Sequence, residues 1–299
     1  MTILNQQNDG LFNVLIVLVR SIIRFSPRDE EQLLLSCGAN LDSVISTQLE
    51  NTVLRWRELG LFCKSDGVIS LAEPYRTMLG SKHDKAEERL PRIARAVVLD
   101  PENNERFWDA EGAKSADFTR AVAWMLAQDV YTLPQSSREL EALVNEQLID
   151  PTAITIVQND TRWNGLNSWM PFLGFAREAN RWEVDPTEAL RDVLPDVFGS
   201  APRLIAGEFL ERIALALPVL DGGKYRREVE SVLKESNWPK PEAGTLSTSL
   251  SRALQRLERE GTLRLQQLSD TGEGATLTGR NRRRWRDFTH VELSRRGSK

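Results

Sequence analysis

The chain has 299 residues, of which 40% are hydrophobic and 27% are charged. This length suits two or three domains, and this balance is typical of ordinary soluble proteins. Only two cysteines, Cys37 and Cys63, and two histidines, His83 and His290, are present. Because so few of these residues are available, we expect no disulfide framework, no metal site, no cofactor and no catalytic residue, and a reducing cytoplasm is the simplest setting.

The formal net charge of −4 is distributed unevenly along the chain. Residues 1–80 hold 7 basic and 9 acidic side chains, residues 81–199 hold 13 and 21, and residues 200–299 hold 19 and 13. Any electrostatic attraction to phosphate is therefore concentrated in the last third of the chain.

The most apolar segment, from Leu11 to Ile23, predicts a buried core helix. It is too short to span a bilayer and it contains Arg20, so we expect no membrane association. Since it has neither a basic stretch before it nor a small-residue cleavage site after it, a signal peptide is not expected.

Residues 1–80 have the pattern of three helices followed by a β-hairpin. Gly10 precedes the first helix, Ser26 and Pro27 open the second, and Gly60 ends the third. The helices are predicted at Leu11–Arg24, from Pro27 to about Cys37, and at Asp42–Leu59, and the hairpin strands at Leu61–Lys64 and Val68–Leu71.

An acidic helical insert is predicted over residues 81–135, with helices at His83–Leu99 and Ser115–Gln128. The next segment, 136–199, begins at a capping Ser136 and contains a helix that ends at Gly174, a short β-type pair, and a further helix before Phe198. Trp163, Trp169 and Trp182 are expected to be core residues rather than the lining of a ligand pocket.

Residues 200–299 follow a predicted linker at Phe198–Pro202. Helices are expected at Arg203–Leu217, Lys224–Ser236 and Ser247–Glu260. The last of these has Leu246, Leu250, Leu254 and Leu257 at intervals of three and four, so one face is apolar. Thr245 is the expected N-cap and Gly261 the expected end. Two β-type runs, Thr262–Leu268 and Ala275–Thr278, are expected to pair as a hairpin around Ser269–Gly274.

Three passages share a helix, a glycine, and two short β-type runs, at glycines Gly60, Gly174 and Gly261. This order resembles the winged helix-turn-helix superfamily. The resemblance implies a mainly α fold with small β-hairpin wings, arranged as three tandem winged-helix-like modules at 1–80, 136–199 and 200–299, the last with a basic C-terminal tail. The glycines are 114 and 87 residues apart, so the modules do not form a regular solenoid.

Candidate DNA-binding residues lie in the last third of the chain. Short hydroxyl side chains allow a recognition helix to approach a groove, and Arg or Gln donates to base edges and phosphates. Five arginines in seven residues repel one another and are favoured beside a polyanion, while Trp285 among them could stack on a base. The candidates are Ser247, Thr248, Ser251, Arg252, Gln255, Arg256, Arg280, Arg282, Arg283, Arg284 and Arg286.

The opening NDGLFNVLIVLVRSIIRFSP, together with the layout of several winged modules, is similar to the DpdG family. Members of that family are accessory proteins of bacterial gene clusters that insert 7-deazaguanine bases into DNA and restrict foreign DNA. The resemblance implies a part in phage defence beside modification or restriction enzymes.

The sequence therefore predicts a non-catalytic, cytoplasmic protein that binds double-stranded DNA. Its acidic N-terminal and middle modules are expected to contact other proteins of the same system or a second copy of the chain. Two alternatives stay open: an assembly subunit whose winged modules bind only proteins, with the basic segment docked on an acidic surface, and an enzyme with an unrecognised site.

Overall fold

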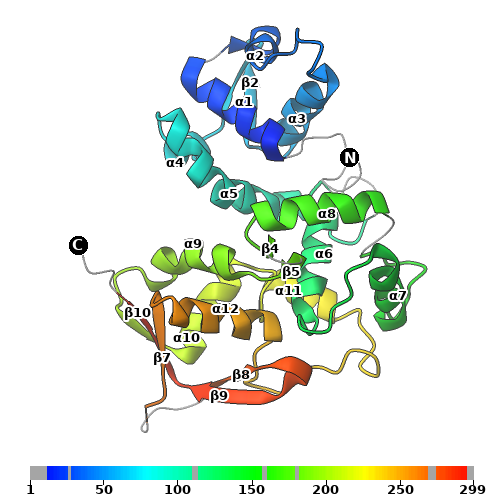
Figure 1. The fold of residues 1–299 in the computed structure, drawn as a ribbon, viewed down its shortest axis with the longest axis vertical. Helices are drawn as coiled ribbons and strands as arrows, with labels where there is room; N and C mark the ends of the chain where they lie inside the picture. The colour runs from blue at the N-terminus through cyan, green and yellow to red at the C-terminus, as the bar shows by residue number, and fades with distance from the viewer. Residues whose placement is uncertain are drawn as a thin grey trace. The chain divides into compact units, whose positions relative to one another are not determined.

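A computed structural model describes residues 12–25, 28–109, 114–156, 160–178, 182–268 and 274–294. The chain forms two compact units. Unit 1 contains the chain up to Phe118 together with residues 159–173, and unit 2 contains Thr119–Gln158 and Gly174 onward. Figure 1 colours both units by residue number. The chain leaves unit 1 inside a helix, at Phe118, returns to it at residue 159, and leaves it again before Gly174.

The first part of unit 1 alternates helices with a three-stranded antiparallel sheet in the order β1-β3-β2. Its elements are α1 (Phe12–Phe25), β1 (Arg28–Asp29), α2 (Glu30–Ser36), α3 (Ser46–Glu58), β2 (Phe62–Ser65) and β3 (Val68–Leu71). The first helix and the hairpin are confirmed. The third helix starts at Ser46 rather than Asp42, and the strand β1 was not expected.

Local chemistry explains where these elements begin and turn. Asp29 accepts the backbone N–H of Gln32 at 2.8 Å and caps α2, so the helix begins after this residue. Asp66 and Gly67 both have positive φ, as a two-residue hairpin turn between β2 and β3 requires. The predicted starts at Gly10 and at Ser26-Pro27 lie outside the described residues.

The rest of unit 1 consists of α4 (Tyr75–Leu79), α5 (His83–Leu99), the 3-10 turn η1 (Pro101–Asn103) and α8 (Asp160–Phe172). Helices α5 and α8 pack on α1, whereas α4 and η1 pack on α5. The ring of Trp169 lies 5.6 Å from that of Trp56 and 6.5 Å from that of Phe12. Arg95, which is buried, donates to the carbonyl of Leu173 at 2.8 Å. The expectation that Trp163 and Trp169 are core residues is confirmed by their burial.

Unit 2 contains the remaining helices and three small sheets. The elements are α6 (Ala116–Ala127, shared with unit 1), α7 (Ser137–Gln147), β4 (Ala176–Glu178), β5 (Trp182–Val184), α9 (Thr187–Phe198), β6 (Arg203–Ile205), α10 (Ala206–Ala216), α11 (Lys224–Glu230), α12 (Thr248–Arg259), β7 (Leu263–Gln266), β8 (Ala275–Thr278), the 3-10 turn η2 (Arg280–Arg282), β9 (Arg284–Phe288) and β10 (His290–Leu293). The mainly α class with small antiparallel sheets is therefore confirmed.

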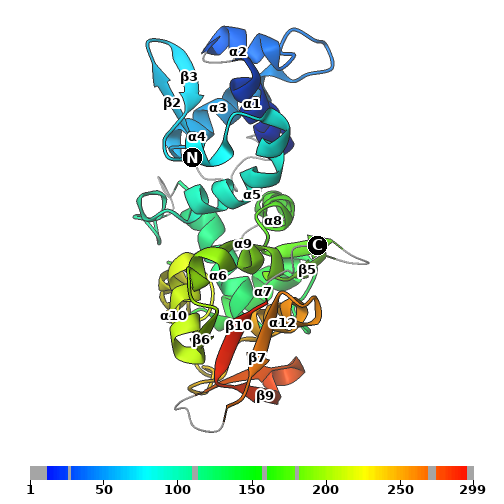
Figure 2. The ribbon, with the colours of Figure 1, turned by 90° about the vertical axis from the view of Figure 1, so that its left-hand side faces the viewer.

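Two expectations for the end of the chain are wrong. The run at 262–268 does not pair with Ala275–Thr278: β7 pairs with β10, and β8 pairs with β9. Figure 2 shows β10 between β6 and β7. The arginine run is part of η2 and β9 rather than a tail. Turn chemistry predicts only pairing between neighbours in sequence, whereas this sheet joins strands that are distant in the chain.

Several helix boundaries also differ from the expected ones. Residues 203–205 form β6, so α10 begins at Ala206, and α11 ends at Glu230 because Leu233 bridges to Leu148 instead. The predicted linker at 198–202 joins α9 to elements of the same unit, since α9 packs on α10 and α12.

A polar network inside unit 2 fixes α6 against α7. The indole N–H of Trp124 donates to Oε1 of Gln147 at 2.8 Å, and Nε2 of Gln147 donates to Oε1 of Gln128 at 2.9 Å. All these groups are buried, so each hydrogen bond replaces one lost to water.

The predicted segment 136–199 contributes α8 to unit 1 and its other elements to unit 2. The module boundaries at 80, 135 and 199 stay predictions. Among the described residues, no helix combines the length and apolar character needed to cross a membrane.

Candidate nucleic-acid interface

The candidate interface starts at α12, whose leucine face is buried as expected. Leu250, Leu254 and Leu257 are fully buried and Gly261 ends the helix with φ of +70°. The N-cap is Ser247 and not Thr245: its Oγ accepts the N–H of Leu250 at 3.2 Å and donates to Oδ1 of Asp221 at 2.6 Å. The expected leucine face and helix end are confirmed, and the expected N-cap is wrong by two residues.

The hydroxyl side chains of α12 are buried rather than open to a groove. Thr248 Oγ1 donates to the carbonyl of Gln128 at 3.2 Å, and Ser251 Oγ accepts the N–H of Thr278 at 2.9 Å. Ser247, Thr248 and Ser251 are at most 8% exposed. The expectation that these three residues form an outward face is wrong, because α12 is covered on a second side by the end of α6 and by β8.

The arginines of the same helix are held by carboxylates of unit 2. Arg252 pairs with Glu183 of β5, and Arg256 Nη1 lies 2.5 Å from Oδ2 of Asp185. The side chains of Arg252 and Arg256 are 19% and 24% exposed. Gln255 between them is half-buried. For both arginines, contact with DNA requires these ion pairs to open. DNA contact stays a prediction for all six candidates of this helix: Ser247, Thr248, Ser251, Arg252, Gln255 and Arg256.

The arginine run lies on a separate hairpin, β8–β9, which is inserted between β7 and β10 (Figure 1). The register shifts between Leu277 and Thr278, so Trp285 falls in a bulge and is 54% exposed. Arg280, Arg283 and Arg284 are exposed, whereas Arg286 pairs with Glu258 of α12 at 2.5 Å. Of these predicted arginines, Arg280, Arg283 and Arg284 are therefore exposed, whereas Arg286 anchors the hairpin to α12.

Arg282 differs from its neighbours because its backbone turns it inward. Asn281 and Arg282 both have left-handed φ, +59° and +57°, and the N–H of Asn281 donates to Oδ2 of Asp129 at 2.6 Å. The guanidinium of Arg282 lies 5.3 Å from the ring centre of Trp238 and donates to the carbonyl of Pro239. Consecutive left-handed residues other than glycine are uncommon, so this turn is held by its surroundings.

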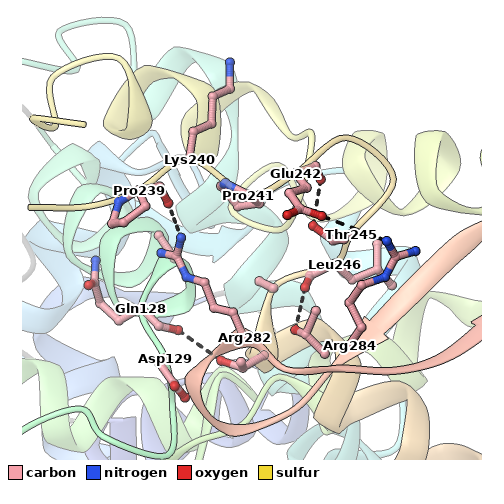
Figure 3. A pocket seen from close by; sticks show the side chains of 14 residues that line it. Gln128, Asp129, Pro239, Lys240, Pro241, Glu242, Thr245, Leu246, Arg282 and Arg284 are labelled. Carbon is pink, nitrogen blue, oxygen red and sulfur yellow. Dashed lines mark hydrogen bonds and ion pairs between the residues drawn. The ribbon is translucent and has the colours of Figure 1, made fainter. Parts of the chain in front are cut away.

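A cavity of about 230 Å³ lies beside this turn, between the end of α6, the Pro239–Glu242 segment and the start of α12. Figure 3 shows Arg282 reaching across it from below and Arg284 on the side of Glu242, while Lys240 extends away. Burial lowers the pKa of Arg282 below its ordinary value, and the neighbouring charge of Arg226 lowers it further. Sequence patterns missed Trp238 and Lys240, although the run Trp-Pro-Lys-Pro before α12 could have indicated them.

No cluster of three or more histidine, cysteine or carboxylate side chains with metal-binding geometry occurs in the described part of the chain. A candidate catalytic constellation is also not evident there, since His83 pairs with Asp84 and His290 is buried in β10 beside Thr289.

Comparison with known proteins gives one match. A family model described as DpdG-like matches residues 1–271, which is most of the chain. No curated protein and no solved structure matches it.

Proposed function

The chain belongs to the DpdG-like family, and we propose that it is a non-catalytic DNA-binding component of a bacterial DNA modification and restriction system directed against phage. Membership fits an accessory role in a DNA-modification cluster. The proposal that the chain binds DNA rests on the β8–β9 hairpin.

We infer two winged-helix modules from the order of the elements. In unit 1 the order α1, β1, α2, α3, β2, β3 forms a sheet β1-β3-β2. In unit 2 the order α9, β6, α10, α12, β7, β10 forms a sheet β6-β10-β7, with α11 added before α12 and the β8–β9 hairpin between the last two strands. In both units the first strand directly precedes a helix and pairs with the last strand, so the two sheets have the same connectivity.

The observation that carries the DNA proposal is the exposed face of this hairpin. Arg280 lies in η2, Arg283 and Arg284 directly precede Trp285 in the chain, and all four side chains are exposed. Arg284 donates to Thr276 Oγ1 at 3.1 Å and lies 3.8 Å from Asp287 and 4.0 Å from Glu242, and 62% of its side chain is exposed. Guanidinium groups near an exposed indole suit backbone phosphates and an unstacked or groove-edge base. Because Arg252 and Arg256, the arginines of α12 predicted to face the groove, are ion-paired, the hairpin is favoured over that helix as the contact surface.

The test is a titration of duplex DNA by fluorescence anisotropy at several salt concentrations. Deleting 280–299 would remove β9 and β10, so substitutions are required. The double variant Arg280→Gln/Arg283→Gln should lower the slope of log affinity against log salt by about 1.8, since each phosphate contact contributes about 0.9. Arg203→Gln/Arg264→Gln removes two exposed charges from β6 and β7 and is the matched control. Absence of duplex binding by the native chain at low salt would reject the proposal.

A second candidate, a protein-assembly subunit, is favoured by apolar side chains of unit 1. Leu35, Leu41 and Ile45 are 49%, 54% and 60% exposed, and all lie between the last turn of α2 and the start of α3. Exposed aliphatic groups gathered in one segment are typical of protein contacts. Under this alternative, Leu41→Ser/Ile45→Ser abolishes co-purification of a partner from the native host and leaves duplex affinity unchanged.

A further inference from the structure

We propose that the cavity beside Arg282 binds one phosphate group, with Arg282 and Arg284 as its donors. Where that phosphate belongs to DNA, the inference rests on the proposed function and deepens it. Where it belongs to a free nucleotide, the pocket is a separate ligand site.

The position of Arg282 is the first reason. The turn at Asn281 and Arg282 is left-handed at both residues, and Asp129 holds it through the Asn281 N–H. This conformation directs the guanidinium into the molecule, against Trp238, rather than into solvent with the other arginines. Uncommon backbone conformations persist where the surroundings hold them, and they concentrate at binding sites.

The local charge is the second reason. Burial lowers the pKa of Arg282 and the charge of Arg226, which is 1% exposed, lowers it further, whereas Asp129 and Glu230 raise it. Arg226 is itself paired with Glu230 at 2.6 Å and Asp221 at 3.5 Å. Of the charged side chains that line the cavity, three are basic and two acidic: Lys240, Arg282, Arg284, Asp129 and Glu242. An anion in the cavity would offset the repulsion between cations that are partly removed from water.

Neither acidic side chain blocks the cavity for an anion. Asp129 is occupied by two backbone donors, the N–H groups of Tyr131 at 3.0 Å and Asn281 at 2.6 Å. Glu242 is 79% exposed and contacts Arg284 only at 4.0 Å, so its side chain can turn to solvent without a large cost.

Lys240 extends away from the cavity in Figure 3, so the basic groups that face it are the guanidinium groups of Arg282 and Arg284. Each of these also donates one hydrogen bond to the protein, to Pro239 and Thr276 respectively. The hydroxyl groups of Thr248 and Thr278 already donate to the carbonyls of Gln128 and Leu246, respectively. Pro239 and Pro241 lack N–H groups and present rings to the opening. The space of about 230 Å³ exceeds the share of several water molecules, at about 30 Å³ each, and accommodates a phosphate with part of a sugar against the prolines. Arginine forks match phosphate oxygens in pairs, which favours phosphate over a smaller halide ion.

The experiment uses the full chain and calorimetric titration with thymidine 5′-monophosphate, with thymidine as the ligand that lacks the phosphate. We expect saturable binding of the monophosphate and none of thymidine. Arg282→Gln should weaken binding about tenfold or more, as for loss of a charged hydrogen-bond donor. Arg264→Gln, on β7 and outside the cavity, should leave it unchanged. Because Arg282→Gln could disturb the turn, Arg284→Gln, whose side chain is 62% exposed, is the second variant and should weaken binding several-fold with an unaltered melting temperature.

Competition with duplex DNA distinguishes the two sources of phosphate. If the monophosphate displaces the duplex, the pocket takes a backbone phosphate; if both bind at once, it takes a free nucleotide. The pocket is overturned if the native chain binds no monophosphate and if neither Arg282→Gln nor Arg284→Gln weakens duplex binding. If Arg280→Gln/Arg283→Gln still weakens duplex binding in that case, the proposed function stands. If the chain binds the monophosphate through Arg282 but binds no duplex, the pocket is supported and the proposed function is rejected.

Discussion

Replacing Arg256 by glutamine separates a structural role for α12 from a role in DNA contact. Asp185, its partner, has a side chain that is 1% exposed and that also accepts the N–H of Thr187 at 3.0 Å, at the start of α9. The substitution leaves a buried carboxylate without its opposite charge. We therefore expect Arg256→Gln to destabilise unit 2 and to leave duplex affinity within about twofold of the native value.

The magnitude follows from the burial of the pair. Removing one partner of a buried ion pair costs roughly 3–5 kcal/mol. Arg256 is 24% exposed, and a cavity of about 240 Å³ beside the pair gives water a route to Asp185, so the lower end applies. For a unit of this size, about 3 kcal/mol corresponds to a fall in melting temperature of about 6–12 °C.

The assay is thermal unfolding by circular dichroism, with anisotropy for DNA binding measured well below the transition. Arg259→Gln is the control, because Arg259 lies on the same helix, is exposed, and should change stability by no more than about 0.5 kcal/mol. A tenfold loss of duplex affinity in Arg256→Gln with an unchanged melting temperature would refute the reasoning and restore α12 as the DNA-contacting helix.

Three further predictions concern positions away from the hairpin. A Cβ at Gly223 would lie 2.3 Å from the carbonyl oxygen of Pro218, so Gly223→Ala should destabilise unit 2 by about 3 kcal/mol or more, as a lower urea midpoint would report. Gln147→Ala leaves two buried groups unpaired, the indole N–H of Trp124 and Oε1 of Gln128, and should lower the free energy of unfolding by about 2–4 kcal/mol in the same experiment. Gln147→Glu keeps an acceptor for the indole and should therefore shift the Trp124 fluorescence less than Gln147→Ala does. Burial raises the pKa of the Cys37 thiol, so less thiolate forms at a given pH, and at pH 8 Cys37 should react with iodoacetamide more slowly than exposed Cys63; equal rates would contradict the burial.

Local patterns were sufficient for most of the helices. The leucines at 250, 254 and 257 define one face of α12 because a helix repeats every 3.6 residues, and Gly261 ends it because glycine adopts left-handed φ without strain. The same reasoning located α5 at its observed bounds and Ser136 as the N-cap of α7. These features depend on residues within one or two turns of each other, so the sequence alone contains them.

The character of the other face of α12 depended on tertiary contacts. Its hydroxyl and arginine side chains have the composition of an open recognition surface, yet Asp185 and the end of α6 cover them from about 70 and 120 residues upstream. Composition cannot report which distant carboxylate meets which arginine, since that depends on how α9 packs on α12.

By itself, therefore, the sequence determined the helices, the glycine ends, the basic last third and the family. Only the tertiary structure decided that Arg252 and Arg256 of α12 are ion-paired while the inserted β8–β9 hairpin exposes Arg280, Arg283 and Arg284. It also decided that Arg282 turns toward a cavity. The physical reason is range: helix periodicity and turn preferences act between near neighbours, whereas exposure and ion pairing are properties of the packed chain.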